Sequence, residues 1–517
     1  MLNLISLLGL ITMIGIAWLM SSHRWKVNWR LVVVGVGLQL LLGAILFNSQ
    51  SWTTYRTFDS YGELVSALEA EEITIDQIDA AISNTDAERI DIGDDWYLTY
   101  SKVQADLKSG IISKEEIETA WPAKALSIPV YPGGILFTIF DTFFKYIEKW
   151  TRVGSEFVFR ANLPPGDSSN PILVVTTFAF GVLPTVIFFA ALMSVLYHIG
   201  IMEVVVKAMA WVMQKLLGTS GAESLAAAAN VFVGHTEAPL VVKPYISGMT
   251  RSELNAMMIG GFATITGGLM AIFVANGISA GHLVTASLVS APAALVIAKI
   301  LQPETESPST LGDVSVKFEK QASNVVEAAA NGASEGMKLA INIAAMLIAF
   351  LALLALIDTL IGGLGELVQA MINLAQPNVD LNWSLKGLFS ILFWPLAWIM
   401  GIQASDCRVS GELLGTKMVV NEFVAYLDLG TILSGDVVDP ETKEVVQISQ
   451  RSKVILTYAL CGFSNFGAIG IQIGGIGPLA PNRRADIAQL GLRAMLGGMI
   501  ACCMTACVAG LFYGFLS

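Results

Sequence analysis

Long apolar stretches without charge recur along the chain and predict membrane-spanning helices. A helix of about nineteen residues is about 28 Å long, which matches the hydrocarbon thickness of a bilayer. The first stretch lacks a basic leader and an Ala-x-Ala site, so we expect a true span rather than a cleaved signal peptide. The uncharged runs cover residues 2–22, 31–51, 171–202, 254–281, 282–298, 339–357, 387–405, 454–482 and 494–517.

The composition agrees with a membrane protein. Of 517 residues, 54% are hydrophobic and 14% are charged, whereas a soluble domain carries about 25% charge. This excludes a cytosolic enzyme, and the formal net charge of −12 leaves no basic surface for a nucleic-acid partner. The five cysteines lie in or beside apolar runs and predict buried thiols rather than disulfides. The four histidines show no metal-ligand spacing, so we expect no zinc and no other cofactor.

Residues 51–127 form an acidic segment that differs from the rest of the chain. They contain sixteen Asp and Glu and six Lys and Arg, which is nearly all of the net charge. Residues 64–78 are echoed thirty-nine positions later by residues 103–117, and each copy contains a capping-box pattern. We expect a water-exposed module of two short helical hairpins. A solvated spacer or a partner-docking element is favoured over a ligand sensor.

Lys and Arg in the short loops predict the orientation in the membrane. The N-terminus, the acidic module and residues 433–450 are then extracytoplasmic. The number of membrane crossings fits this orientation only if two segments enter and leave on the same side. We expect residues 207–245 and 387–426 to be these re-entrant hairpins. The basic residues assigned to the cytoplasm are Arg24, Lys26, Arg30, Lys207, Lys215, Lys243, Arg251, Lys299, Lys317, Lys320, Arg483 and Arg484.

The membrane portion also repeats itself. Gly261-Phe-Ala-Thr-Ile265 matches Gly462-Phe-Ser-Asn-Phe466 at an offset of 201, and a hairpin candidate that carries an acid precedes each copy. The copies enter from opposite sides, and inverted repeats with glycine-interrupted helices are typical of secondary transporters. The predicted fold is an all-α polytopic membrane protein with an inverted repeat, two re-entrant helical hairpins, broken transmembrane helices and a small acidic helical insertion.

These patterns divide the chain into six parts. They are two N-terminal transmembrane helices (1–50), the acidic extracytoplasmic insertion (51–128), an interfacial helix with the third transmembrane helix (129–202), the first repeat (203–300), a cytoplasmic linker with a scaffold helix (301–383) and the second repeat (384–517).

Glu237 and Glu422 are the acids of the two hairpins. A carboxylate in the apolar zone costs at least ~2.5 to 3.5 kcal/mol, so such a residue usually faces a wet cavity and a ligand. The alternative is that they form structural ion pairs with Lys243 and Lys417. No Arg lies near either acid in sequence, so a neutral polyhydroxylated or amide-bearing ligand is favoured over an anion.

At these positions the chain resembles the concentrative nucleoside transporter family. The resemblance covers residues 1–50 and 129–517 but not the acidic module. The motifs that carry it are Asn230-Val-Phe-Val-Gly-His-Thr-Glu-Ala-Pro239 with Pro244-Tyr245, Met249-Thr-Arg-Ser-Glu253, Gly260-Gly-Phe-Ala-Thr-Ile-Thr-Gly267, Asn421-Glu-Phe-Val-Ala-Tyr426 and Tyr458-Ala-Leu-Cys-Gly-Phe-Ser-Asn465.

The resemblance implies a homotrimer in the plasma membrane, here the bacterial inner membrane, with a transport domain that moves against a trimerising scaffold. Family members carry nucleosides inward, driven by sodium or, in some members, by protons. It places His235, Thr236, Glu237 and Leu269 at the nucleobase, Phe463 against the base, and Glu422 and Asn465 at the ribose hydroxyls. It places sodium on Asn230, Val233, Thr264 and Ile265, and oxygen ligands suit such a hard cation.

Two positions depart from the family pattern. His235 stands where many members have Gln, and Ala468 stands where a Ser is usual. The first change affects recognition of the base, because an imidazole's tautomer decides which nitrogen donates, and the second removes a hydroxyl from the ribose side. His235 could instead be a hydrogen-bonded core histidine, and the Thr264 hydroxyl could bond back to its own helix.

The sequence therefore predicts a sodium-driven nucleoside symporter. The alternatives are a proton-coupled symporter or a transporter of the same fold with another neutral polar substrate. A receptor in which the acidic module senses a ligand is a further alternative. An intramembrane hydrolase that uses His235 and Glu237 is disfavoured, because neither motif pairs a Ser or Cys nucleophile with a base.

Overall fold

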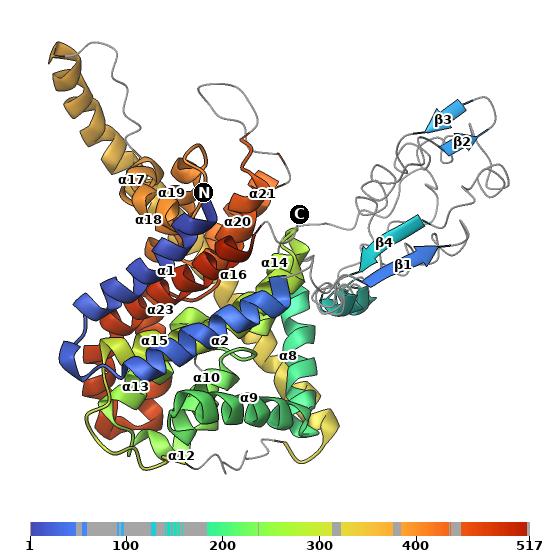
Figure 1. Ribbon diagram of the computed structural model, residues 1–517, viewed down its shortest axis with the longest axis vertical. Helices are drawn as coiled ribbons and strands as arrows, with labels where there is room; N and C mark the ends of the chain where they lie inside the picture. The colour runs from blue at the N-terminus through green and yellow to red at the C-terminus, as the bar shows by residue number, and fades with distance from the viewer. Residues whose placement is uncertain are drawn as a thin grey trace. The chain divides into compact units, whose positions relative to one another are not determined.

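The computed structural model contains two compact units. It describes residues 2–47, 54–58, 90–92, 95–97, 126–130, parts of 140–158, 183–235, 237–312, 322–375, 384–433, 435 and 446–513. The first unit comprises Met1–Ala44 and Phe144–Tyr513, and the second is mainly Ile45–Phe143. Each unit is considered separately below (Figure 1).

The second unit contains four short strands. Strand β1 (Thr54–Phe58) pairs antiparallel with β4 (Leu126–Val130), and β2 (Ile90–Ile92) pairs with β3 (Asp95–Tyr97). The β1–β4 pair joins the two ends of the acidic segment, so the segment is an insertion closed at its base. We expected helical hairpins in this segment and did not predict these strands. The strands contain β-branched and aromatic residues, which are suited to sheets. Residues 64–78 and 103–117, where the hairpins were predicted, lie outside the described residues.

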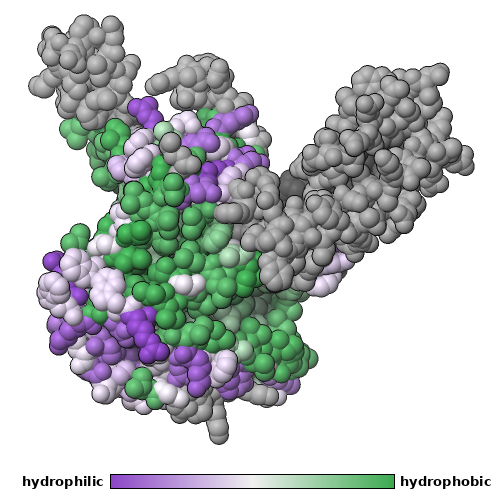
Figure 2. All heavy atoms as spheres, in the orientation of Figure 1, coloured by the Kyte–Doolittle hydropathy of each residue, from purple (hydrophilic) through white to green (hydrophobic). Residues whose placement is uncertain are grey.

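The first unit is a multi-pass membrane protein. Within the described residues, five helical segments are long and apolar enough to cross a bilayer, or six if α8 (Leu183–His198) and α9 (Ile201–Leu217), bent by 77°, count as one span. Figure 2 shows an apolar band on this unit between more polar ends, with exposed leucines and isoleucines of the N-terminal helices among its residues. The five are α1 (Leu2–Leu19), α2 (Trp29–Phe47), α13 with α14 (Arg251–Ala275), α15 (Ala280–Leu301), and η4 with α23 (Pro481–Phe512).

Two similar series of helices follow each other along the chain. In Figure 1, α12 and α13 lie toward the lower end of the helical unit, and α20 and α21 lie toward the upper end. The first series is α10 (Gly221–Ala229), α11 (Ala238–Val241), α12 (Lys243–Ile246), α13 (Arg251–Ala263), α14 (Gly267–Ala275) and α15 (Ala280–Leu301); the second is α19 (Cys407–Val419), α20 (Glu422–Leu433), α21 (Gln450–Leu460), α22 (Phe466–Ile476) and α23 (Arg484–Phe512).

The hairpin helices are too short to cross a bilayer singly. Helix α10 has 9 residues and α19 has 13, which correspond to about 14 and 20 Å against a hydrocarbon core of about 30 Å. Helices α17 (Leu385–Leu392) and α18 (Trp394–Ile399), which precede α19, are shorter still. These lengths agree with hairpins that enter the membrane and return.

Helix α16 (Val325–Ala375) packs along α8. A Cβ atom at Gly332 would lie 2.6 Å from the carbonyl oxygen of Ala190, and one at Gly336 would lie 2.7 Å from the Cα of Ile187. Only glycine permits this approach, and glycines spaced by four residues are a frequent means of close helix packing in membranes. The pair therefore forms a tightly packed element beside the repeats.

The two series meet in the core of the unit, where α13, α15, α21 and α23 pack together. Gly462 has a φ of +141°, and a Cβ there would lie 2.6 Å from the carbonyl oxygen of Phe262. Glycine is required at this crossing, both for the backbone angle and for space. All five cysteines are buried and free, which confirms the prediction of thiols.

Candidate functional site

Two breaks in the helices of the first repeat lie against each other. Residues 230–237 separate α10 from α11, and residues 264–266 separate α13 from α14. The backbone N–H of Gly267 donates to the carbonyl oxygen of Phe232 at 3.2 Å, which joins the two breaks. A helix end leaves backbone groups without partners in their own helix. The breaks are therefore places where the backbone can contact a ligand.

His235 lies at the contact between the two repeats. Its ring centroid is 4.5 Å from that of Phe463, at an interplanar angle of 63°. The histidine is 8% exposed, and neither ring nitrogen has a hydrogen-bond partner among the described residues. It is therefore not the hydrogen-bonded core histidine of the alternative interpretation. Buried polar groups are nearly always satisfied, so these nitrogens favour a role in ligand binding. Thr236 lies outside the described residues.

Glu237 and Leu269 belong to the same pair of breaks. Glu237 is exposed and immediately precedes α11, and its Oε2 accepts from the N–H of Gly234 at 3.1 Å. A carboxylate has about four acceptor positions, so Glu237 can accept further hydrogen bonds from a ligand. Leu269 is 5% exposed, and its N–H donates to Oγ1 of Thr266, the residue that caps α14.

Glu422 and Asn465 are bonded to each other in the second repeat. Nδ2 of Asn465 donates to Oε2 of Glu422 at 2.9 Å, and Oδ1 of Asn465 accepts from the N–H of Ala468 at 2.8 Å. Glu422 begins α20 and is 3% exposed, while Asn465 caps α22. The amide therefore fixes the orientation of a buried carboxylate that retains acceptor capacity.

The two ion pairs considered as an alternative role for the acids are not formed. Lys243 is exposed, and the ammonium of Lys417 donates to the carbonyl oxygen of Ala459 at 2.8 Å. Among the described residues neither lysine forms a salt bridge with Glu237 or Glu422. Neither acid is thus in an ion pair within the described part of the chain, although Lys417 interacts with Glu422 electrostatically at longer range. This fits a site for a neutral ligand with hydroxyl or amide donors.

The four residues predicted to hold sodium lie at the breaks of the first repeat. Asn230 ends α10 and is 1% exposed, and neither atom of its amide has a partner among the described residues. A buried amide oxygen without a donor fits a hard cation. The Thr264 hydroxyl donates to the carbonyl oxygen of Gly260 at 2.9 Å, the local bond expected for this residue type. Its lone pairs can still contact an ion, as can the backbone at Val233 and Ile265.

Gln472 was not predicted as part of this region. It is fully buried on α22, and its Nε2 donates across the repeats to the carbonyl oxygen of Met258 at 3.1 Å. A Cβ at Gly261 would lie 2.7 Å from the same Nε2 and 2.6 Å from the Cβ of His235. An amide within the apolar, glycine-rich residues 466–476 is the sequence signal that could have indicated it.

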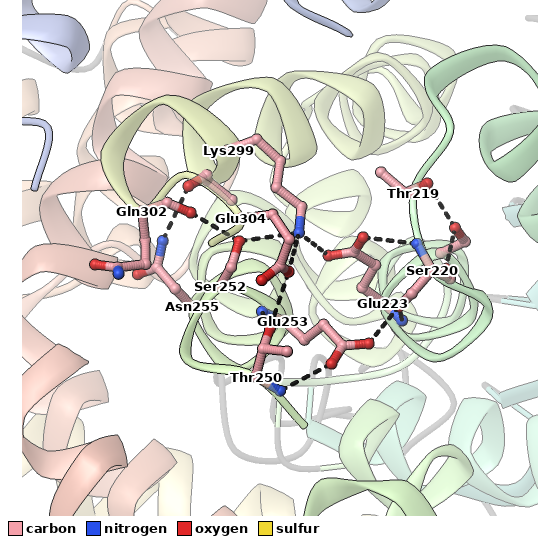
Figure 3. A network of polar contacts seen from close by, with 12 residues as sticks. Thr219, Ser220, Glu223, Thr250, Ser252, Glu253, Asn255, Lys299, Gln302 and Glu304 are labelled. Atoms are coloured by element: carbon pink, nitrogen blue, oxygen red, sulfur yellow. Dashed lines mark hydrogen bonds and ion pairs between the residues drawn. The ribbon is translucent and has the colours of Figure 1, made fainter. Parts of the chain in front are cut away.

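Two capping boxes join the first hairpin to its broken helix (Figure 3). Ser220 with Glu223 caps α10, and Thr250 with Glu253 caps α13. Oγ of Ser220 also donates to Oε1 of Glu253 at 2.5 Å, and Nζ of Lys299 on α15 lies 2.7 Å from Oε2 of Glu223. The cluster holds the ends of three helices together, and so fixes the helix that leads into the break at residues 230–237.

The second repeat has a comparable link with the chemical roles exchanged. Oδ2 of Asp406, directly before α19, accepts from Oγ of Ser452 at 2.7 Å and from the N–H of Ser449 at 3.0 Å. Here the hairpin supplies the carboxylate and the broken helix supplies the hydroxyl. Each hairpin is thus fastened to the broken helix of its own repeat.

Sequence models of one transporter family match most of the chain. The models described as "Na+ dependent nucleoside transporter N-terminus" and "Na+ dependent nucleoside transporter C-terminus" match residues 8–70 and 282–510. A model described as "Nucleoside recognition" matches residues 179–280.

Individual relatives agree with these matches. An "Uncharacterized transporter" of Haemophilus influenzae is 44% identical over 362 residues, which cover 70% of this chain and 81% of that protein. "Sodium/nucleoside cotransporter 1" of Mus musculus is 40% identical over 386 residues, or 74% of this chain and 56% of that protein. The chain thus matches little more than half the length of this mammalian relative.

Solved structures of the same kind share the fold. The structure of "CNTnw in an inward-facing substrate-bound state" superposes with a TM-score of 0.70 at 33% identity, covering 99% of this chain and 98% of that one. An outward-facing structure of a CNTnw variant gives a TM-score of 0.71 at 34% identity, covering 99% of each chain. The matching models, the identity to known transporters and the shared fold show that this chain belongs to the concentrative, Na+-dependent nucleoside transporter family, whose members are transporters and not enzymes.

Proposed function

We propose that this chain is a symporter that imports nucleosides with a sodium ion. The observation that carries the proposal is the pair of Glu422 and Asn465, a buried carboxylate held by an amide at 2.9 Å and, among the described residues, not in an ion pair. A carboxylate in this state is an acceptor for hydroxyl donors, and the two vicinal hydroxyls of a ribose are such donors. The aromatic contact between Phe463 and His235 provides the adjacent surface for a planar base.

The substrate residues divide into a sugar side and a base side. On the sugar side, Glu422 and Asn465 bind and orient the ribose hydroxyls. His235, with both ring nitrogens unbonded in the described residues, and the exposed carboxylate of Glu237 bind polar atoms at the edge of the base. Leu269 and, from the sequence motif, Thr236 are assigned to the same side. Because an imidazole and a carboxylate together offer donors and acceptors, both uridine and adenosine are suitable first substrates.

Sodium would bind at the helix ends that carry Asn230 and Thr264, with Val233 and Ile265 supplying backbone oxygens. A cation there neutralises the negative ends of two helix dipoles. It also holds the break at residues 230–237, which carries His235 and Glu237. Sodium binding therefore orders the base side of the substrate site, and this is a physical basis for coupling the ion to the nucleoside.

We place the protein in the bacterial inner membrane as a homotrimer, with the acidic insertion on the extracytoplasmic side. The Lys and Arg bias of the loops supports this orientation. Exposed leucines in the middle of α16 support burial of this helix against lipid or against other copies of the chain. These side chains are Leu351, Leu353, Leu356, Leu360 and Leu364. Native mass spectrometry of the detergent-solubilised protein tests the trimer, and thiol labelling of a cysteine placed in residues 51–127 of intact cells tests the orientation.

The proposal is tested by uptake of radiolabelled uridine and adenosine into proteoliposomes with and without an inward sodium gradient. Glu422→Gln should lower sodium-dependent uptake by roughly tenfold or more, because the loss of a charge-assisted hydrogen bond of about 1.5 to 3 kcal/mol has that effect. Glu203→Gln is the matched control, since Glu203 is paired with Lys207 on the outer helix α9 and should not affect uptake.

The same assay separates the alternatives. Uptake that needs a proton gradient and ignores sodium would replace sodium by protons as the driving ion. Accumulation of neither nucleoside under either gradient would move the search to other neutral polar metabolites. Wild-type uptake by Glu422→Gln would remove Glu422 from the site.

A further inference from the structure

Lys417 is a charged side chain buried in the interior of the helical unit. Its side chain is 0% exposed, and it lies in the last turn of α19. The ammonium donates to the carbonyl oxygen of Ala459 at 2.8 Å, and within the described residues it forms no salt bridge. An ammonium removed from water without a carboxylate in direct contact is costly. The Glu422 carboxylate interacts with Lys417 electrostatically beyond ion-pair distance, so the groups that contact the ammonium directly must supply the remaining negative potential.

Two helix C-termini supply that potential. Helix α19 ends at Val419 and α21 ends at Leu460, directly before the break around Gly462. Ala459, whose carbonyl accepts from Lys417, is in the last turn of α21. Each helix C-terminus carries about half an elementary negative charge. The Lys417 ammonium thus lies where two such ends approach each other.

The first repeat has a corresponding pair of helix ends. Helix α10 ends at Ala229 and α13 ends at Ala263, and the two helices are in contact. Asn230 follows α10, and a Cβ at Gly260 in the last turn of α13 would lie 3.0 Å from its Nδ2. Among the described residues no Lys or Arg reaches this place, and the Asn230 amide is unbonded. The first repeat has the negative helix ends without a cationic side chain.

We propose that the Lys417 ammonium is a tethered cation that occupies, in the second repeat, the position that the coupling sodium occupies in the first. The inference rests on the proposed sodium-coupled function and deepens it. The pair of helix ends in the first repeat binds an exchangeable sodium ion. The pair in the second repeat is neutralised by the covalently attached ammonium of Lys417. The chain therefore couples one sodium, not two, at these two positions, and Lys417 is a positioning residue for the second hairpin rather than a substrate ligand.

Two neutral variants separate the charge of Lys417 from its hydrogen bond. Lys417→Gln retains a donor for the Ala459 carbonyl and fills most of the space, but it has no charge. Lys417→Ser removes the charge and leaves room and an oxygen ligand for a sodium ion. Lys417→Arg retains the charge and is the positive control. Uridine uptake into proteoliposomes is measured as a function of sodium concentration, with gel filtration to verify folding.

The wild type should show a sodium Hill coefficient of about 1, since this coefficient is bounded by the number of sites. Lys417→Gln should lose uptake by roughly tenfold or more at every sodium concentration, because an uncharged group cannot balance two helix ends. Lys417→Ser should lose a similar amount at the concentration that saturates the wild type, and should regain uptake at higher sodium with a Hill coefficient rising toward about 2. Lys417→Arg should keep the wild-type coefficient.

Wild-type uptake and sodium dependence in Lys417→Gln would overturn the inference, because the hydrogen bond and not the charge would then be what matters. A wild-type Hill coefficient near 2 would also overturn it. If Lys417→Ser does not fold, Lys417→Gln alone decides the outcome. A wild type without sodium dependence would overturn the proposed function, and the inference with it, whereas normal wild-type dependence with a normal Lys417→Gln overturns the inference only.

Discussion

Replacing Lys299 should destabilise the helical unit by the cost of an unpaired buried carboxylate. Nζ of Lys299 lies 2.7 Å from Oε2 of Glu223 and 3.3 Å from Oε2 of Glu304, and it donates to Oγ of Ser252 at 3.0 Å. Lys299→Met keeps the length of the side chain but removes the charge. Glu223 is then left buried with its hydrogen bond from the N–H of Ser220 as its remaining partner.

The magnitude follows from the exposure of each group. The side chains of Lys299 and Glu223 are 7% and 1% exposed, so this pair is not screened by solvent. Removing one partner of such a pair costs about 3 to 5 kcal/mol. The Glu304 side chain is 25% exposed, so it can be hydrated and adds little. At about 2 °C of melting temperature per kcal/mol, the unfolding midpoint should fall by roughly 6 to 10 °C.

The assay is the thermal unfolding of detergent-purified protein, followed by the fraction that remains monodisperse after heating. Lys338→Met is the matched control, because the Lys338–Glu335 pair on α16 is 68% and 69% exposed and should be worth about 0 to 1 kcal/mol. Adding Glu223→Gln to Lys299→Met should restore part of the loss, since it removes the unpaired charge. Equal midpoints for Lys299→Met and Lys338→Met would show that the buried pair stabilises the protein no more than the exposed pair does.

Three further predictions concern the two repeats. Asn230→Leu should raise the sodium concentration for half-maximal uptake by about tenfold, because a cation ligand is lost; an unchanged sodium curve would contradict this role. Gly462→Ala should cost about 1 to 3 kcal/mol in thermal unfolding through its positive φ, whereas Gly474→Ala, in a helix with open space around it, should be neutral or slightly stabilising. Asp406→Ala should lower stability by about 1 to 3 kcal/mol, because the donors of Ser452 and Ser449 lose their acceptor, and an unchanged melting midpoint would argue against the link.

The sequence predicted the long helices because a bilayer imposes a local rule on composition. The uncharged runs at 2–22 and 282–298 correspond to α1 and α15 to within a few residues. A backbone in lipid must bond within its own helix, so the spans can be read without knowledge of their neighbours. The glycines near 260–268 likewise indicated the broken helix, which the structure interrupts at residues 264–266.

The acidic insertion was less predictable. Its charge identified it as a separate module, but strands β1 and β4 come from its two ends and pair across the whole segment. A pairing between distant residues leaves a weak local signal, because a strand of five residues is defined mainly by its partner. We predicted helices in this segment because its capping-box patterns are local signals that can be recognised in the sequence.

The candidate site shows the same division. The motifs indicated that Glu422 and Asn465 belong to one site, and the bond of 2.9 Å between them agrees with this. They did not indicate Gln472, which reaches across the repeats to Met258. They also left open whether His235 has a partner, which depends on every residue packed around it.

Local composition and short motifs were enough to predict the membrane class, the main spans, the inverted repeat and the two acids. What those residues contact depends on packing between segments far apart in the chain. Lys417 is near Glu422 in the chain, yet its ammonium bonds to the carbonyl of Ala459, forty-two residues away. Packing sets the directions in which helix ends and breaks present their backbone dipoles. The hydrogen-bond partner of this lysine therefore could not be predicted from its neighbours in sequence.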